Sequence, residues 1–154
     1  MPSEYVMYLS MLLVGALAIA GISATMMSLN NTIENRAIKT ELEHILQKIS
    51  EVIHNVRNEG QKEIEQGAQS FDLIVMLNMP QKVQNEEYKV EVTSSSASYY
   101  LKATLVHQTN VNVVISLQIS PNELSISGSL SSTSSTNKVM FSYDGQNIEI
   151  FLES

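Results

Sequence analysis

The chain has 154 residues but no cysteine and no tryptophan, and it has only six glycines and three prolines. Without cysteine there is no disulfide framework, although this absence does not by itself assign a compartment. Six scattered glycines form no phosphate-binding loop, so we expect no nucleotide site. The nine lysine and arginine residues are scattered too, and the net charge of −7 argues against a nucleic-acid partner.

Catalytic and metal-binding patterns are also missing from the sequence. The three histidines are His44, His54 and His107. On a helix, the first two would lie about 15 Å apart along the axis, too far for one metal ion. Serine is abundant, yet there is no Gly-x-Ser-x-Gly motif and no acid–histidine pair placed to activate a nucleophile. We therefore predict that the chain is not an enzyme and that it uses no metal and no cofactor.

The chain does contain a long apolar run without charge at residues 5–29. As a helix this run measures about 37 Å, more than the roughly 30 Å hydrocarbon core of a bilayer. A cleavable signal peptide has a basic start and a shorter apolar centre. Here Glu4 is the only charge before the run, and Ser23-Ala24-Thr25 is a poor cleavage site. We predict a membrane helix that is kept in the working protein.

Small residues recur within this helix. Ala16, Ala20 and Ala24 follow one another at four-residue spacing, with Gly21 beside them, and such a shallow surface allows another helix to approach closely. Small residues are also common in membrane helices without this role. Glu4 would need a partner inside a helix bundle, for which a free α-amine is the nearest candidate. Alternatively, Glu4 lies among lipid headgroups or in water and favours the helix N-terminus.

A second helical pattern covers residues 34–65, where apolar residues recur every three or four positions. One interpretation is a helix packed on its own sheet. The other is an interface with identical stripes of neighbouring subunits, and the two are compatible because the stripe is longer than one small sheet. The residues assigned to that interface are Leu42, Ile45, Ile49, Val52 and Val56. The whole stripe comprises Ile38, Leu42, Ile45, Leu46, Ile49, Val52, Ile53 and Val56.

Poor helix formers and glycines occur at several positions of the helical region. Asn30, Asn31 and Thr32 lie between the two patterns and predict a kink or short break. They also form the one N-glycosylation sequon, which makes Asn30 a candidate acceptor. Gly60 predicts a weakening of the helix, and Gly67 its end.

After Gly67 the apolar period changes to two, which indicates strands. Asp144-Gly145 between two alternating runs predicts a hairpin. We predict an α+β chain in which a long N-terminal helix with its amphipathic stalk, residues 1–69, precedes an antiparallel β-sandwich or partly closed barrel of about seven strands, residues 70–154. The expected strands cover residues 71–77, 88–93, 99–105, 111–119, 124–130, 139–143 and 148–152.

Ser3-Glu4-Tyr5-Val6 opens the apolar helix, which runs unbroken to Leu29 and is followed by an amphipathic continuation and a β-rich head. In these features the chain resembles the archaeal type IV pilin-like superfamily, which includes adhesive pilins, archaellins and membrane-anchored accessory subunits of the archaellum. The resemblance covers the whole chain as architecture and about the first 30 residues as motif. It implies that the helices form a filament core, that the heads form its surface, and that Glu4 pairs with a neighbouring subunit's amine.

Family precursors carry a basic leader before the apolar helix, whereas this sequence begins at Met1 without one. Either the leader is omitted from the sequence, or the chain is a leaderless anchored relative.

The resemblance predicts a structural subunit of an extracellular filament at the cell surface, with identical subunits as partners and the membrane as its location before assembly. The alternative is a membrane-anchored archaellum accessory subunit that binds an envelope partner through its β-sandwich. Arg36 and Lys39 would draw the head inward by the positive-inside tendency. That signal is balanced by Glu34 and Glu41, and we keep the head outside.

Overall fold

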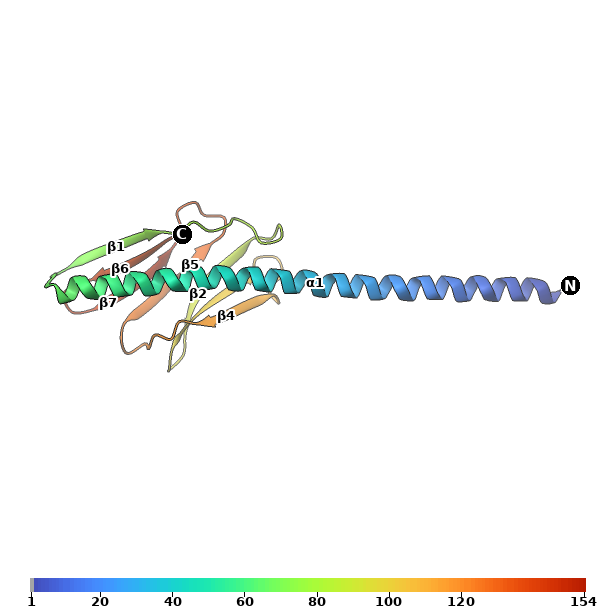
Figure 1. The fold of residues 1–154 in the computed structure, drawn as a ribbon, viewed down its shortest axis with the longest axis horizontal. Coiled ribbons are helices and arrows are strands. Elements are labelled where there is room, and N and C mark those ends of the chain that lie inside the picture. The colour runs from blue at the N-terminus through green and yellow to red at the C-terminus, as the bar shows by residue number, and fades with distance from the viewer. Residues whose placement is uncertain (1) are drawn as a thin grey trace. The chain divides into compact units, whose positions relative to one another are not determined.

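The computed structural model describes the backbone of residues 2–154 and the side chains from Glu4 onward. It divides into two compact units, residues 1–37 and residues 38–154. One long helix precedes a seven-stranded sheet, which confirms the α+β class (Figure 1). The elements are α1 (Pro2–Glu65), β1 (Phe71–Met76), β2 (Tyr88–Ser94), β3 (Tyr99–Leu105), β4 (Asn112–Ser116), β5 (Ser125–Ser131), β6 (Lys138–Tyr143) and β7 (Ile148–Glu153).

Helix α1 is continuous through Asn30, Asn31 and Thr32, so of the predicted kink or short break the break is wrong. The propensity cost of these residues is below about 1 kcal/mol each, and adding a residue to an established helix is much easier than starting one. The Thr32 hydroxyl also donates a hydrogen bond to the carbonyl of Ser28 at 2.9 Å. The two sequence patterns are therefore parts of one helix.

The helix ends as predicted at Gly67, whose φ of +93° lies in the left-handed region. The amide of Gly67 donates to the carbonyl of Ile64, and the amide of Ala68 donates to that of Glu63, which is the pattern of a Schellman cap. Gly60, in contrast, does not interrupt the helix. A side chain at Gly60 would overlap the ring of Phe141, so glycine is needed there for close packing of helix and sheet.

The seven strands follow the order β1-β6-β7-β5-β2-β3-β4. All neighbours are antiparallel except β5 and β7, which run parallel. All seven predicted strands are present. The strands form one hydrogen-bonded series, which covers the core from one side. Helix α1 is the opposite layer, so the arrangement is sandwich-like with a helix in place of a second sheet. Strand β4 ends earlier than predicted, because Gln118 adopts a φ of +54° and bulges opposite Tyr99.

The core of residues 38–154 lies between the α1 stripe and one face of this sheet. Buried and partly buried residues alternate along β3, where every second side chain is buried. The compact unit therefore begins at Ile38 and not at residue 70, because the stripe supplies one layer of the core. The fully buried large side chains include Leu42, Leu46, Ile49, Ile53, Tyr88, Leu101, Leu105, Leu117, Ile119, Leu130, Phe141 and Ile150.

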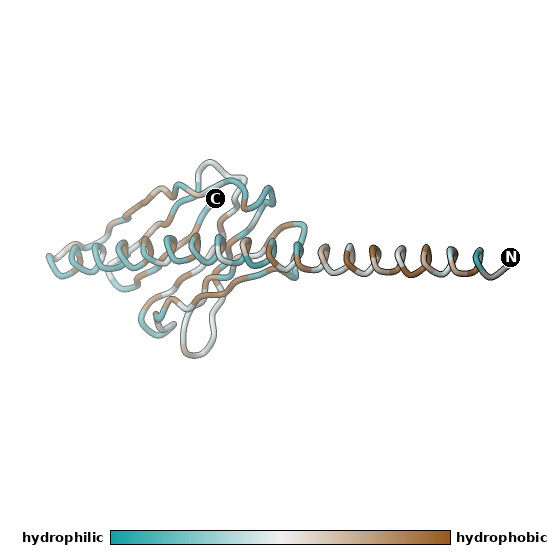
Figure 2. Tube along the Cα trace, turned by 45° about the vertical axis from the view of Figure 1, so that its right-hand side comes forward, coloured by the Kyte–Doolittle hydropathy of each residue, from teal (hydrophilic) through white to brown (hydrophobic). Residues whose placement is uncertain are grey.

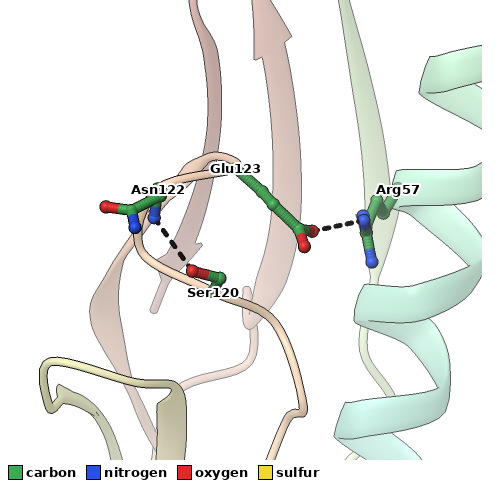
Figure 3. Close-up of polar contacts among 4 residues, drawn as sticks. All are labelled: Arg57, Ser120, Asn122 and Glu123. Carbon is green, nitrogen blue, oxygen red and sulfur yellow. Dashed lines mark hydrogen bonds and ion pairs between the residues drawn. The ribbon is translucent and has the colours of Figure 1, made fainter.

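Polar contacts also tie the helix to the loops of this unit. Nη2 of Arg57 on α1 lies 2.6 Å from Oε2 of Glu123, in the loop before β5 (Figure 3). The Ser120 hydroxyl accepts a hydrogen bond from the amide of Asn122 at 3.3 Å and so shapes that loop. In the β6–β7 hairpin, the Asp144 carboxylate accepts hydrogen bonds from the amides of Asn147 and Gln146. The predicted hairpin is present, with a four-residue turn and Gly145 at a φ of +98°.

Candidate membrane and assembly surface

The N-terminal part of α1 exposes an apolar surface around its whole circumference. Every large hydrophobic side chain from Tyr5 to Ile33 is 58–84% exposed, and no charged residue lies between Glu4 and Glu34. Figure 2 shows this part of the helix mostly in hydrophobic colours. The most apolar 18-residue window has a mean hydropathy of 2.1, and the helix is long and apolar enough to cross a membrane.

Two hydroxyl side chains in this part of α1 bond to the helix itself. The hydroxyl of Ser10 donates to the carbonyl of Met7 at 2.9 Å, and that of Thr25 donates to the carbonyl of Gly21 at 2.5 Å. Hydroxyls that are satisfied within the helix cost little in a solvent without hydrogen-bonding groups. The hydroxyls of Ser10 and Thr25 are therefore no obstacle to covering this surface with lipid or protein.

Water is a poor environment for this surface. Burying one large aliphatic side chain is worth about 1.5–3 kcal/mol, so the apolar side chains of residues 5–33 together represent tens of kcal/mol. The net stability of a domain is only about 5–15 kcal/mol. The surface consequently needs an apolar cover, either a bilayer or other protein.

The predicted contact residues in this unit are on the helix surface. Ala16, Ala20 and Ala24 advance by about 40° per step, and Gly21 lies about 60° further around, so they share one side of the helix. All four are exposed. A side chain added at Gly21 would meet nothing within 4 Å, so the position is open to a neighbouring helix.

A fifth small residue on this helix, Gly15, was missed by the sequence reasoning. Gly15 is equally open, and it forms the floor of a shallow hollow between large side chains. The hollow is lined by Tyr8, Met11, Leu12, Gly15, Ala16 and Ile19. The sequence does contain a signal for this hollow. Large side chains lie three to four residues before and after Gly15, and residues at that spacing share a helix face.

Glu4 and Asn30 are both exposed on α1. Glu4 lies in the first turn of the helix, where its charge is favourable to the helix dipole. The pairing of Glu4 with a neighbouring subunit's amine stays a prediction. Asn30 lies within helical backbone.

The stripe residues assigned to a subunit interface require a correction. Leu42 is 0%, Ile45 6%, Ile49 2% and Val56 1% exposed, and Val52 is half-buried against the same core. They contact the chain's own sheet, because the sheet is wide enough to cover nearly the whole stripe. Only opening the head would make them available to another subunit, so the helix-on-sheet interpretation is the correct one.

Residues 38–154 also carry a groove of about 450 Å³ between α1 and the segment after β1. Its floor is apolar, and its rim carries Glu41, His44, Lys48 and Glu51 from the helix. Pro80 on the far wall is held by the hydroxyl of Tyr88, which donates to the Pro80 carbonyl at 2.7 Å. Burial of that phenol, and then the nearby Glu41 carboxylate, raise the pKa of Tyr88.

Within residues 2–154, no three histidine, aspartate or glutamate side chains are grouped in a way that would hold a metal ion. The arrangement as a whole offers surfaces for contact with lipid or protein.

The model of one protein family matches residues 3–153, and its description is "Family of unknown function (DUF7266)". No curated protein and no solved structure matches the chain. The family match covers both the apolar helix and the sheet, so the two parts occur together as one family unit.

Proposed function

We propose that this chain, which belongs to the family of unknown function DUF7266, is a structural subunit of an archaeal type IV pilus-like extracellular filament. The observation that carries the proposal is the exposed apolar surface of α1 from Tyr5 to Ile33. The same helix contributes its later residues to the core of the folded head. The resemblance of the first 30 residues to the pilin-like superfamily gives this surface its proposed role. The chain acts by assembly and not by catalysis.

In the proposed cycle, a bilayer covers the apolar helix before assembly and neighbouring helices cover it afterwards. Lipid and a helix bundle are both apolar, so the transfer gains little hydrophobic free energy. Association then depends on close packing, which small residues such as Ala16, Ala20 and Gly21 permit. Leaving the membrane is the step that requires an external motor. Glu4, once buried among helices, pairs with the amine of a neighbouring subunit.

The first test is to shear cells that make the protein and image the released material by electron microscopy. Mass spectrometry then identifies the chain and its N-terminal peptide. We expect it to be the main component of the filaments, with a processed N-terminus. Detection of the chain only in membranes would contradict the proposal.

The second test addresses helix packing. Ala20→Leu places a bulky side chain on the small-residue surface and should abolish filaments while leaving the thermal unfolding of the head unchanged. Ile19→Leu, on the same turn, conserves volume and should leave filaments intact. Filaments of normal number from the Ala20 variant would remove the support for close helix packing.

The alternative function is a membrane-anchored accessory subunit that binds an envelope partner. The groove between α1 and Met79–Pro80 is the observation that favours it, because a folded head with an apolar groove suits a binding module. This function predicts that the full-length chain stays in the membrane fraction and can be cross-linked to another envelope protein. Replacing Met79 in the groove by alanine would then reduce that cross-link.

A further inference from the structure

The sheet of the head has two open edges, formed by β1 and β4. In Figure 1 these strands lie on opposite sides of the C-terminal half of α1. An open edge presents unpaired backbone amides and carbonyls, which another strand can satisfy. The question is whether the two edges are complementary to each other.

The hydrogen-bond phase of each edge follows from the ladder beside it. The amide of Leu77 donates to the carbonyl of Asn137, which extends the β1–β6 register. Because successive residues of an antiparallel strand bond to opposite sides, the backbone groups of Asp72, Ile74 and Met76 are directed to the open edge.

On β4, the hydrogen-bond phase follows from the β3–β4 ladder. The amide of Leu105 donates to the carbonyl of Val111, in register with the β3–β4 ladder. The backbone groups of Asn112, Val114 and Ser116 are therefore directed to the second open edge. Each edge therefore has three residues, two positions apart, whose backbone groups are directed outward.

The two sets also have their side chains on the same face of the sheet. Asp72, Ile74 and Met76 are exposed, whereas the residues between them pack on the core. Asn112, Val114 and Ser116 are exposed likewise, and Val113 and Ile115 pack on the core. Directly opposed residues of paired strands have side chains on the same face. A β1–β4 junction between two heads would thus keep both cores on one side.

Strand direction is matched as well. In a sheet of seven strands that alternated throughout, the first and last strands would run the same way. The single parallel pair, β5 and β7, reverses one half of the sheet, so β1 and β4 run in opposite directions. A second head that continues the sheet would consequently join through an antiparallel pair.

The edges also lack the usual protection against pairing. Strand β4 contains no charged residue and β1 contains only Asp72, and neither contains proline. Exposed edges in natural sheets commonly carry lysine or proline. Large side chains are exposed instead, with Ile74 at 56%, Met76 at 60% and Val114 at 50%.

From these observations we propose that β1 of one head pairs antiparallel with β4 of a second copy, with Ile74 opposite Val114. Asp72 then lies opposite Ser116, and Met76 opposite Asn112. The contact is head-to-tail and leaves an open edge at each end, as a growing filament requires. The inference rests on the proposed filament, because a single strand pair is too small an interface to hold subunits together without the helices.

The absence of cysteine from the chain allows a direct test by disulfide cross-linking. Opposed residues on paired strands have Cα atoms about 5.5 Å apart, within the range that a disulfide spans. Oxidised filaments of the Ile74→Cys, Val114→Cys double variant should give a ladder of covalent oligomers that reductant removes. The matched control is Ile74→Cys with Thr93→Cys, since Thr93 is also exposed but lies on the interior strand β2. It should give no ladder, and neither should either single variant of the test pair.

A second variant covers the case in which the cysteine protein does not fold. Val114→Lys adds a charge to the open edge of β4 and should give fewer and shorter filaments, whereas Thr93→Lys should leave the filaments unchanged. Filaments without a ladder, or normal filaments from Val114→Lys, overturn edge pairing and leave the proposed filament function standing. A wild-type chain that forms no filaments overturns both proposals.

Discussion

The assignment of the α1 stripe to the head core makes a quantitative prediction for Leu42→Ala. Leu42 is 0% exposed and is covered by the sheet, so truncation removes buried methyl groups and leaves a cavity. Such substitutions cost about 2–5 kcal/mol. For a unit slightly larger than 100 residues, 1 kcal/mol corresponds to about 4 °C in Tm, so we expect a decrease of roughly 8–20 °C.

The measurement is thermal unfolding of the full-length chain in mild detergent, followed by the near-ultraviolet circular dichroism of buried tyrosines such as Tyr88. Leu17→Ala is the matched control, because Leu17 is 64% exposed on the apolar part of the same helix. It should change the Tm of the head by less than about 2 °C, the effect of a surface substitution of up to 0.5 kcal/mol. Equal effects of the two substitutions would refute the conclusion that the stripe is core.

Three further predictions concern the same head. Gly60→Ala should lower the free energy of unfolding by up to about 2 kcal/mol. Overpacking against Phe141 costs about 1–3 kcal/mol, and the higher helix propensity of alanine offsets about 1 kcal/mol of this. A raised Tm would contradict this and would show that the Phe141 ring moves aside. Hydrogen bonds from the Asn147 and Gln146 amides lower the pKa of Asp144 from its ordinary value of 3.8. The stabilisation of the fold by the Asp144 carboxylate is thus present above about pH 4 and is lost as pH falls through the lowered pKa. The Tm should therefore decrease less between pH 5 and pH 2 in Asp144→Ala than in the wild type. An equal decrease in the two proteins would contradict this. Glu123→Gln should cost at most about 1 kcal/mol, with a loss that shrinks at high salt, because the Arg57–Glu123 pair is partly exposed.

The strands of the head were predictable because the sheet is buried on one face only. The alternation of apolar and polar residues in a strand such as Tyr99–Leu105 then indicates which side chains contact the core. The end of β4 was not predictable, because the apolar alternation continues through Leu117 and Ile119 after the backbone has bulged at Gln118. Residues on both sides of a bulge can still be buried, so periodicity alone does not locate it.

Periodicity identified the buried face of the α1 stripe but not its partner. A residue such as Ile49 has the same pattern whether its own sheet or another subunit covers it, and only the three-dimensional arrangement distinguishes the two. The order of the strands is equally absent from local patterns, because the parallel pairing of β5 with β7 joins residues more than 20 positions apart. The exposed apolar surface was predictable at residues 5–29, since an uncharged run of that length needs no tertiary information.

The place of β7 within the sheet has a consequence for the time course of folding. Strand β7 follows the other six described strands in the sequence, yet it lies between β6 and β5 and pairs with both. Until Ile148–Glu153 has been synthesised, β1 and β6 form one fragment, and β5, β2, β3 and β4 form another. The head can therefore become one cooperative unit only after Ile148–Glu153 has been added, well over 100 residues after the apolar part of α1 has been made.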